Sequence, residues 1–116
     1  CRAGWAPMLL QWMDRQASER PGLFSDTGLK ELPSYYVKRQ VTITFEEDYI
    51  AGMLLEHPES GMEDILMWGA DYPHGQGVWP DAEDVMEKTF ANVDDTVRKK
   101  VVFDRCMEMF SLTGPV

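Results

Sequence analysis

The sequence predicts an α/β fold in which parallel strands alternate with helices. The segment from Val41 to Phe45 is rich in β-branched and aromatic residues, which is typical of a strand. The run from Ile65 to Trp68 is continuously apolar, as expected for a strand buried on both faces of a parallel sheet. Apolar residues at helical spacing between Tyr49 and Leu55 indicate a helix between the two strands. This order predicts a right-handed strand-helix-strand unit with adjacent parallel strands, the second ending near Gly69.

Two helices are expected before the first strand. The segment from Ala6 to Ala17 has Pro7 near its start, where a helix tolerates proline. A polar loop from Ser18 to Pro33 comes next, and Ser34 is expected to cap a short helix that continues through Arg39.

Two more helices are expected after the second strand. One begins at Pro80-Asp81, with Asp84 completing a box-like cap on Asp81. The last begins near Asp95 and is expected to bury five apolar residues: Val97, Val101, Val102, Met109 and Phe110. No linker divides the chain, so residues 1–116 are expected to form one domain.

Charge and composition limit the partners. The chain has 11 Lys and Arg against 20 Asp and Glu, a formal net charge of -9, which argues against binding to nucleic acid or to an anionic membrane. Its two cysteines, Cys1 and Cys106, are far apart and suggest no disulfide framework, so we expect a cytoplasmic protein. The start at Cys1, followed directly by structured-looking sequence, suggests a fragment without its N-terminal part.

Polar residues come directly after both predicted strands. Functional residues in parallel α/β proteins gather at the carboxyl ends of the strands. Glu46 comes after the first strand, and Asp71 and His74 come after the second. A carboxylate buried at the end of an apolar strand needs a cation, a metal or hydrogen-bond donors, so Asp71 is a candidate for metal binding or proton transfer. The alternative is that Asp71 orders the next turn and that His74 is a hydrogen-bonded surface group.

Two further candidates have structural alternatives. Glu46 could point into a site, or it could belong with Glu47 and Asp48 to a solvated cap of the next helix. Trp5 lies in a turn before the first helix, where its ring could line a pocket or pack against that helix.

Four stretches resemble segments of the amidohydrolase-related family, which includes aminocarboxymuconate-semialdehyde decarboxylase. The resemblance covers nearly the whole chain in the expected order. It is carried by Gly4-Trp5-Ala6-Pro7 with Met13-Asp14-Arg15, by Leu32-Pro33-Ser34-Tyr35-Tyr36 with Arg39-Gln40, by Thr44-Phe45-Glu46-Glu47-Asp48, and by Met67-Trp68-Gly69-Ala70-Asp71-Tyr72-Pro73-His74 followed by Trp79-Pro80.

The resemblance implies the C-terminal part of a (β/α)8 TIM barrel, containing only its last strands and helices, because a complete barrel needs roughly 250 residues. It implies part of a metal-dependent hydrolase or decarboxylase that acts on a small cyclic or carboxylated substrate. Asp71 would bind the catalytic divalent ion, zinc or manganese, or accept a proton from its water, and His74, Trp5 and Glu46 would contact the substrate. The histidine ligands would come from the missing N-terminal part of the same barrel, so this chain alone would be inactive.

Other interpretations of the sequence stay open. The chain could instead be a non-catalytic α/β interaction domain that has lost the metal site. The intact protein could also be a homo-oligomer. An HxH pair after an apolar strand upstream of Cys1 would favour the enzyme.

Overall fold

A computed structural model describes residues 2–113 and consists mainly of helices. Four 3-10 turns connect the longer elements: Pro21–Leu23, Ser25–Thr27, Pro58–Ser60 and Met62–Asp64. The elements in chain order are α1 (Ala6–Glu19), α2 (Pro33–Gln40), β1 (Ile43–Phe45), α3 (Tyr49–Leu55), β2 (Leu66–Trp68), α4 (Ala82–Thr89), α5 (Asp95–Lys99), a π-helical stretch (Lys100–Asp104) and α6 (Arg105–Met109).

The predicted strand-helix-strand order and the adjacent parallel strands are confirmed. β1 and β2 are adjacent and parallel, with Ile43 opposite Leu66 and Phe45 opposite Trp68, and α3 lies in the connection between them. The ladder continues past β2, because the Gly69 N–H donates to the Phe45 carbonyl oxygen at 3.0 Å. Both strands are shorter than expected.

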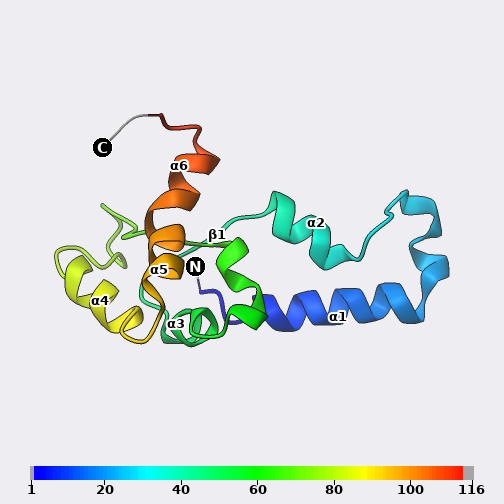
Figure 1. Cartoon of the computed structure of the whole chain (residues 1–116), viewed down its shortest axis with the longest axis horizontal. Coiled ribbons are helices and arrows are strands. Elements are labelled where there is room, and N and C mark those ends of the chain that lie inside the picture. The colour runs from blue at the N-terminus through cyan, green and yellow to red at the C-terminus, as the bar shows by residue number, and fades with distance from the viewer. Residues whose placement is uncertain (1, 114–116) are drawn as a thin grey trace.

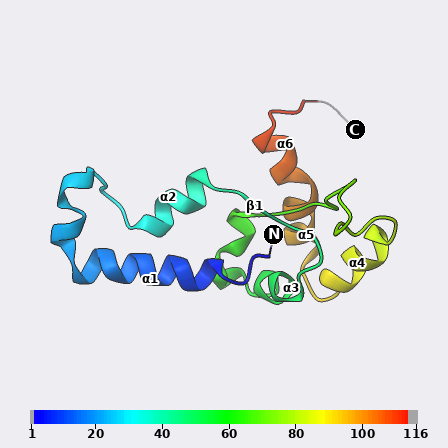
Figure 2. The ribbon, with the colours of Figure 1, turned by 180° about the vertical axis from the view of Figure 1, so that it is seen from behind.

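The prediction of the C-terminal part of a TIM barrel is wrong. The described residues contain one two-stranded sheet, and helices dominate the structure. A barrel unit would lay each helix against the sheet, but α1 and α2 instead extend away from β1 as a helical arm (Figure 1). The view from behind shows the same arm (Figure 2). The sequence pattern identified the helices but not the surface on which each one packs.

The arm is held together by contacts between its own helices. α1 and α2 pack against each other, and the Ser34 N–H donates to Asp14 Oδ1 at 2.9 Å. Ser34 is therefore not the N-cap that the sequence suggested: α2 begins at Pro33, with Leu32 at the capping position. Much of the outer face of α1 is exposed, including Met8 and Trp12.

The core lies around the two strands. Phe45, Ile65 and Leu66 are fully buried, and the ring of Phe45 lies 6.2 Å from that of Phe90, between centroids. The predicted last helix is confirmed as the continuous helical segment from α5 to α6, which buries Val97 and Val101 against the core. The predicted burial of Met109 and Phe110 is wrong, because both are more than half exposed at the end of α6, beyond the part of the helix that packs on the core.

The predicted cap of α4 is wrong. The Asp81 side chain makes no capping hydrogen bond. The first turn of α4 instead contains Glu83 and Asp84, whose negative charges interact favourably with the positive end of the helix dipole. Among residues 2–113, no helix has both the length and the apolar character needed to cross a bilayer.

Candidate functional site

Glu46 and Asp71 both lie at the end of the sheet where the two parallel strands have their carboxyl ends. Each lies beyond the carboxyl end of a strand, and the strands are parallel and paired to their last residues, Phe45 and Trp68. The Trp68 Nε1–H donates to the Glu46 carbonyl oxygen at 3.1 Å, which fixes the two exits next to each other. The two strand ends at which the sequence predicted functional residues therefore lie next to each other in the structure.

Asp71 begins a compact loop closed by backbone hydrogen bonds. The His74 N–H donates to the Asp71 carbonyl oxygen at 2.8 Å, and the Val78 N–H returns to the Ala70 carbonyl oxygen at 3.1 Å. Gly77 permits this closure, because a Cβ there would lie 2.7 Å from the carbonyl oxygens of both Ala70 and Asp71. The loop therefore holds a defined shape although most of its residues are exposed.

Asp71 itself has an unusual backbone conformation. Its φ of 54° lies in the left-handed region, which costs free energy for a residue with a Cβ, although aspartate tolerates it better than most. The expectation that this carboxylate is buried at the strand end is wrong, because its side chain is 56 % exposed. The argument that this carboxylate needs a partner because it is buried therefore does not apply to Asp71.

The side chains of Asp71 and His74 point toward each other. Asp71 Oδ2 and His74 Nδ1 are 3.2 Å apart, and both side chains are more than half exposed. A carboxylate that contacts one imidazole nitrogen orients the ring and leaves Nε2 for a ligand or a proton. The arrangement can therefore contribute a carboxylate oxygen and a ring nitrogen to a metal ion or a substrate.

Two aromatic rings lie together on this loop. The sequence places Tyr72 at the same strand end as Asp71, but it did not single out Trp79 as a site residue. Tyr72 and Trp79 pack edge to face, with 5.7 Å between ring centroids, although both are about two-thirds exposed. They come from the two ends of the same closed loop.

Asp48 occupies the position on β1 that corresponds to Asp71 on β2, three residues after the strand. Its carboxylate is 2 % exposed and accepts three backbone N–H groups: Ala3 at 2.6 Å, Ile50 at 3.0 Å and Ala51 at 3.2 Å. The predicted capping role for this acidic segment is confirmed at Asp48, the N-cap of α3. The expectation that the cap is solvated is wrong for this residue.

Glu46 lies at this end of the sheet, whereas Trp5 lies on the segment that enters α1. The Asp48 carboxylate accepts the Ala3 N–H, and Trp5 follows two residues later at the N-cap of α1. Trp5 is 48 % exposed. Glu46 is half-buried, and its carbonyl oxygen accepts the Trp68 indole N–H.

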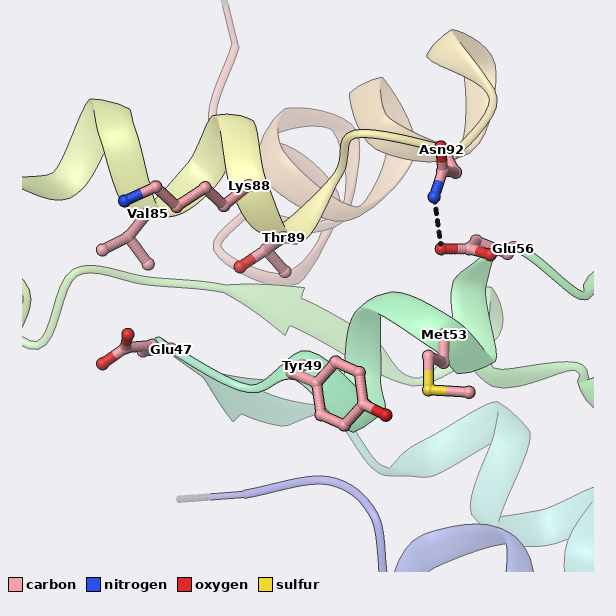
Figure 3. Close-up of a pocket in the computed structure, with 8 residues that line it drawn as sticks. All are labelled: Glu47, Tyr49, Met53, Glu56, Val85, Lys88, Thr89 and Asn92. Atoms are coloured by element: carbon pink, nitrogen blue, oxygen red, sulfur yellow. Dashed lines mark hydrogen bonds between the residues drawn. The ribbon is translucent and has the colours of Figure 1, made fainter.

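One cavity borders the Asp71 loop, and a second cavity next to it lies farther from the loop. The first, of about 370 Å³, is bordered by the loop residues Gln76 to Trp79 and by α4. The other, of about 510 Å³, lies between α3 and α4, and Figure 3 shows Glu47 and Lys88 at the end opposite the Asn92–Glu56 hydrogen bond. Glu47, Val85 and Lys88 line both cavities, so an acidic and a basic group lie where the two cavities adjoin.

The metal ligands within residues 2–113 do not form a complete set. No group of three or more His, Cys, Asp or Glu side chains there is arranged to hold a metal ion. Asp71 and His74 fit two positions, whereas a zinc site in an enzyme takes three protein ligands. A carboxylate and an imidazole are suitable ligands for a divalent ion, but two of them are too few for a catalytic zinc site.

Comparison with known proteins assigns no family. The chain matches neither a model of a known protein family nor a curated protein sequence.

Proposed function

We propose that this chain is part of a metal-dependent hydrolase or decarboxylase of the amidohydrolase-related type, acting on a small cyclic or carboxylated substrate. The observation that supports this most is the Asp71–His74 pair, held in a closed loop where β2 ends and left open to solvent. A carboxylate kept in an unfavourable conformation and left exposed contributes little to folding, which favours a role in binding.

Asp71 would supply a carboxylate oxygen to the divalent ion, zinc or manganese, or accept a proton beside it. His74 would contact the substrate or the ion through Nε2, because its Nδ1 faces Asp71 at 3.2 Å. The ion would supply Lewis-acid polarisation of the bond that breaks. Trp5 and Glu46 are the further proposed substrate contacts, and the Glu46 carbonyl oxygen accepts the Trp68 indole N–H at the end of β2.

The remaining ligands would come from outside these residues. Two donors do not make a tight site, and a catalytic metal also needs groups that orient each ligand. The 116-residue chain alone should therefore bind zinc weakly and turn nothing over. Tight one-to-one zinc binding by the chain itself would contradict this part of the proposal.

The decisive experiment uses the intact protein that contains this chain. Bound metal and turnover on a panel of aromatic and cyclic carboxylates are measured for Asp71→Asn and His74→Ala. Asp26→Asn, on an exposed 3-10 turn of the arm, is a matched control for the loss of one carboxylate charge. We expect Asp71→Asn to lose both metal and turnover and Asp26→Asn to keep both. An Asp71→Asn protein with parental metal content and rate would contradict the proposal.

A non-catalytic interaction domain is the second candidate. The incomplete ligand set within residues 2–113 and the exposed apolar face of α1, where Met8 is 68 % and Trp12 57 % exposed, favour it. An intact protein without bound metal, and without an HxH pair in its other sequence, would support this candidate. For either function we propose a cytoplasmic location, because Cys106 is a free thiol.

A further inference from the structure

A groove at the opposite end of the sheet from Asp71 gathers basic side chains. It consists of two adjoining cavities, of about 450 and 210 Å³, that share three basic residues and one acidic residue: Lys38, Arg39, Arg105 and Glu108. Residues 40–42, which line it, directly precede β1, and Asp64 precedes β2. Because the strands are parallel, this groove lies at their amino ends, whereas Asp71 lies beyond a carboxyl end.

The charge of the groove differs from that of the rest of the chain. Four of the chain's 11 basic residues line it, in a chain of formal net charge -9. Of these, Lys100 already has carboxylate partners, since Nζ donates to Glu63 at 2.9 Å and to Asp64 at 2.7 Å. Lys38 and Arg39 have no carboxylate partner within residues 2–113. The groove therefore keeps an excess of positive charge.

Arg105 is the most informative of these residues. Only 17 % of its side chain is exposed, and its Nε is buried without a hydrogen-bond acceptor in the described part of the chain. Its one ion pair among residues 2–113, Nη1 to Glu108 Oε2, is 3.6 Å long and reaches a carboxylate that is itself 78 % exposed. A guanidinium that is mostly removed from water with only one long ion pair is poorly compensated, so an anion in the groove beside its exposed part would offset that cost.

Structural roles account for only part of this cluster. Lys38 and Arg39 lie in the last turn of α2, where positive charges interact favourably with the negative end of the helix dipole. Arg39 also lies 5.6 Å from the ring centroids of both Tyr35 and Tyr36, which holds the guanidinium in place. Neither role explains why Arg105, from a different helix, converges on the same groove.

We infer that this groove binds a small oxyanion, the phosphate or carboxylate group of a ligand, between Arg39 and Lys38 of α2 and Arg105 of α6. Arginine recognises such planar or tetrahedral groups through two parallel N–H donors, and lysine adds a point charge. The site is separate from the Asp71 site and does not depend on the function proposed for it.

The test is a titration of the 116-residue chain with sodium phosphate and, separately, with sodium malonate, each compared with sodium chloride at the same ionic strength. Backbone amide chemical shifts of Arg39, Gln40 and Arg105 report binding. The variants are the double substitution Lys38→Gln with Arg39→Gln, and the single substitution Arg105→Gln. The double substitution Arg20→Gln with Lys30→Gln removes the same charge from exposed positions elsewhere on the chain.

We expect saturable shifts with at least one oxyanion and none with chloride. The Lys38/Arg39 double variant and Arg105→Gln should each weaken binding by about tenfold or more, while the Arg20/Lys30 variant should match the parent. Stronger binding of phosphate assigns a phosphate group to the ligand, and stronger binding of malonate assigns a carboxylate. Shifts that do not saturate, that chloride reproduces, or that the Arg20/Lys30 variant loses equally would overturn the inference. If Arg105→Gln does not fold, the result from the Lys38/Arg39 variant decides, since Arg39 is exposed and neither residue is buried.

Discussion

Asp48 and Asp71 stand three residues beyond two paired parallel strands, yet their surroundings are opposite. Asp48 is almost fully buried and accepts three backbone N–H groups, one of them from Ala3, far earlier in the chain. Asp71 is exposed, has a left-handed backbone and faces the imidazole of His74. The same residue type at the same strand offset thus has a structural role in one case and an available side chain in the other.

The difference comes from the segment that each strand leads into. After β1 the chain turns directly into α3, whose first N–H groups need an acceptor and find the Asp48 carboxylate. After β2 the chain forms a closed loop whose backbone bonds to itself, so the Asp71 side chain is not needed as a cap. A strand-end carboxylate is a functional candidate only when the next element does not use it in this way.

The largest expected effect on stability is at Asp48. Replacing Asp48 with alanine removes the α3 cap and leaves the buried Ala3 N–H without an acceptor, which should cost about 2–4 kcal/mol. Asp48→Asn, which keeps one acceptor oxygen, should cost less. Urea unfolding followed by circular dichroism measures both, and a loss below about 0.5 kcal/mol for the alanine variant would contradict the structural role.

Gly77 tests whether the Asp71 loop is closed as described. A methyl group at residue 77 would meet the Ala70 and Asp71 carbonyl oxygens, so Gly77→Ala should destabilise the loop by about 1–3 kcal/mol. Gly75→Ala is the control, because nothing lies within 4 Å of a Cβ there. Amide hydrogen exchange at Val78 should speed up in the Gly77 variant and not in the Gly75 variant. Equal exchange in both would mean that the loop does not close in this way.

The ion pairs of Lys100 with Glu63 and Asp64 should make the free energy of unfolding depend on pH. Burial lowers the pKa of Lys100, but hydrogen bonds and charges from Asp64 and Glu63 outweigh burial and raise that pKa above its ordinary value of 10.5. Its contribution is fully present below pH 10.5 and is lost as pH rises through the raised pKa in the folded state. Because the side chain is 37 % exposed, Lys100→Met should cost only about 0.5–1 kcal/mol at neutral pH. The difference in unfolding free energy between parent and variant should shrink above roughly pH 11. A difference that is constant across that range would exclude the ion-pair explanation.

The smallest stability effect is expected at Asp71. Glycine adopts a φ of 54° without strain, so Asp71→Gly should leave stability unchanged or raise it by up to about 1 kcal/mol. Calorimetric melting compares it with the parent. A clear loss of stability would show that the contact with His74 holds the loop, and Asp71 would then resemble Asp48.

Local patterns in the sequence predicted the local structure well. The apolar run at 65–68 and the β-branched run ending at Phe45 predicted the strands and their parallel pairing, because each pattern reflects burial that both strands need. The direction of the α1–α2 arm was not predicted, since amphipathic spacing shows which face is apolar but not what covers it. The predicted barrel failed at that step.

The site was predicted only in part. Asp71 and His74 were selected and do lie together, because three residues separate them in one loop. The burial of Asp48 depends on Ala3, which is 45 residues away, and no local pattern shows that contact. The exposure of Asp71 depends on its left-handed backbone and on the close approach of Gly77, both properties of the folded loop.

The most direct test measures bound metal and unfolding free energy on the same preparations of the intact protein, with Asp71→Asn and Asp48→Asn side by side. The number of metal ions per chain is determined by elemental mass spectrometry, and stability is measured by urea unfolding after the metal has been removed. The account predicts that Asp71→Asn loses metal while its stability stays within about 0.5 kcal/mol of the parent, and that Asp48→Asn is less stable. An Asp71→Asn protein that keeps its metal, or that loses as much stability as Asp48→Asn, would contradict the distinction between the two aspartates.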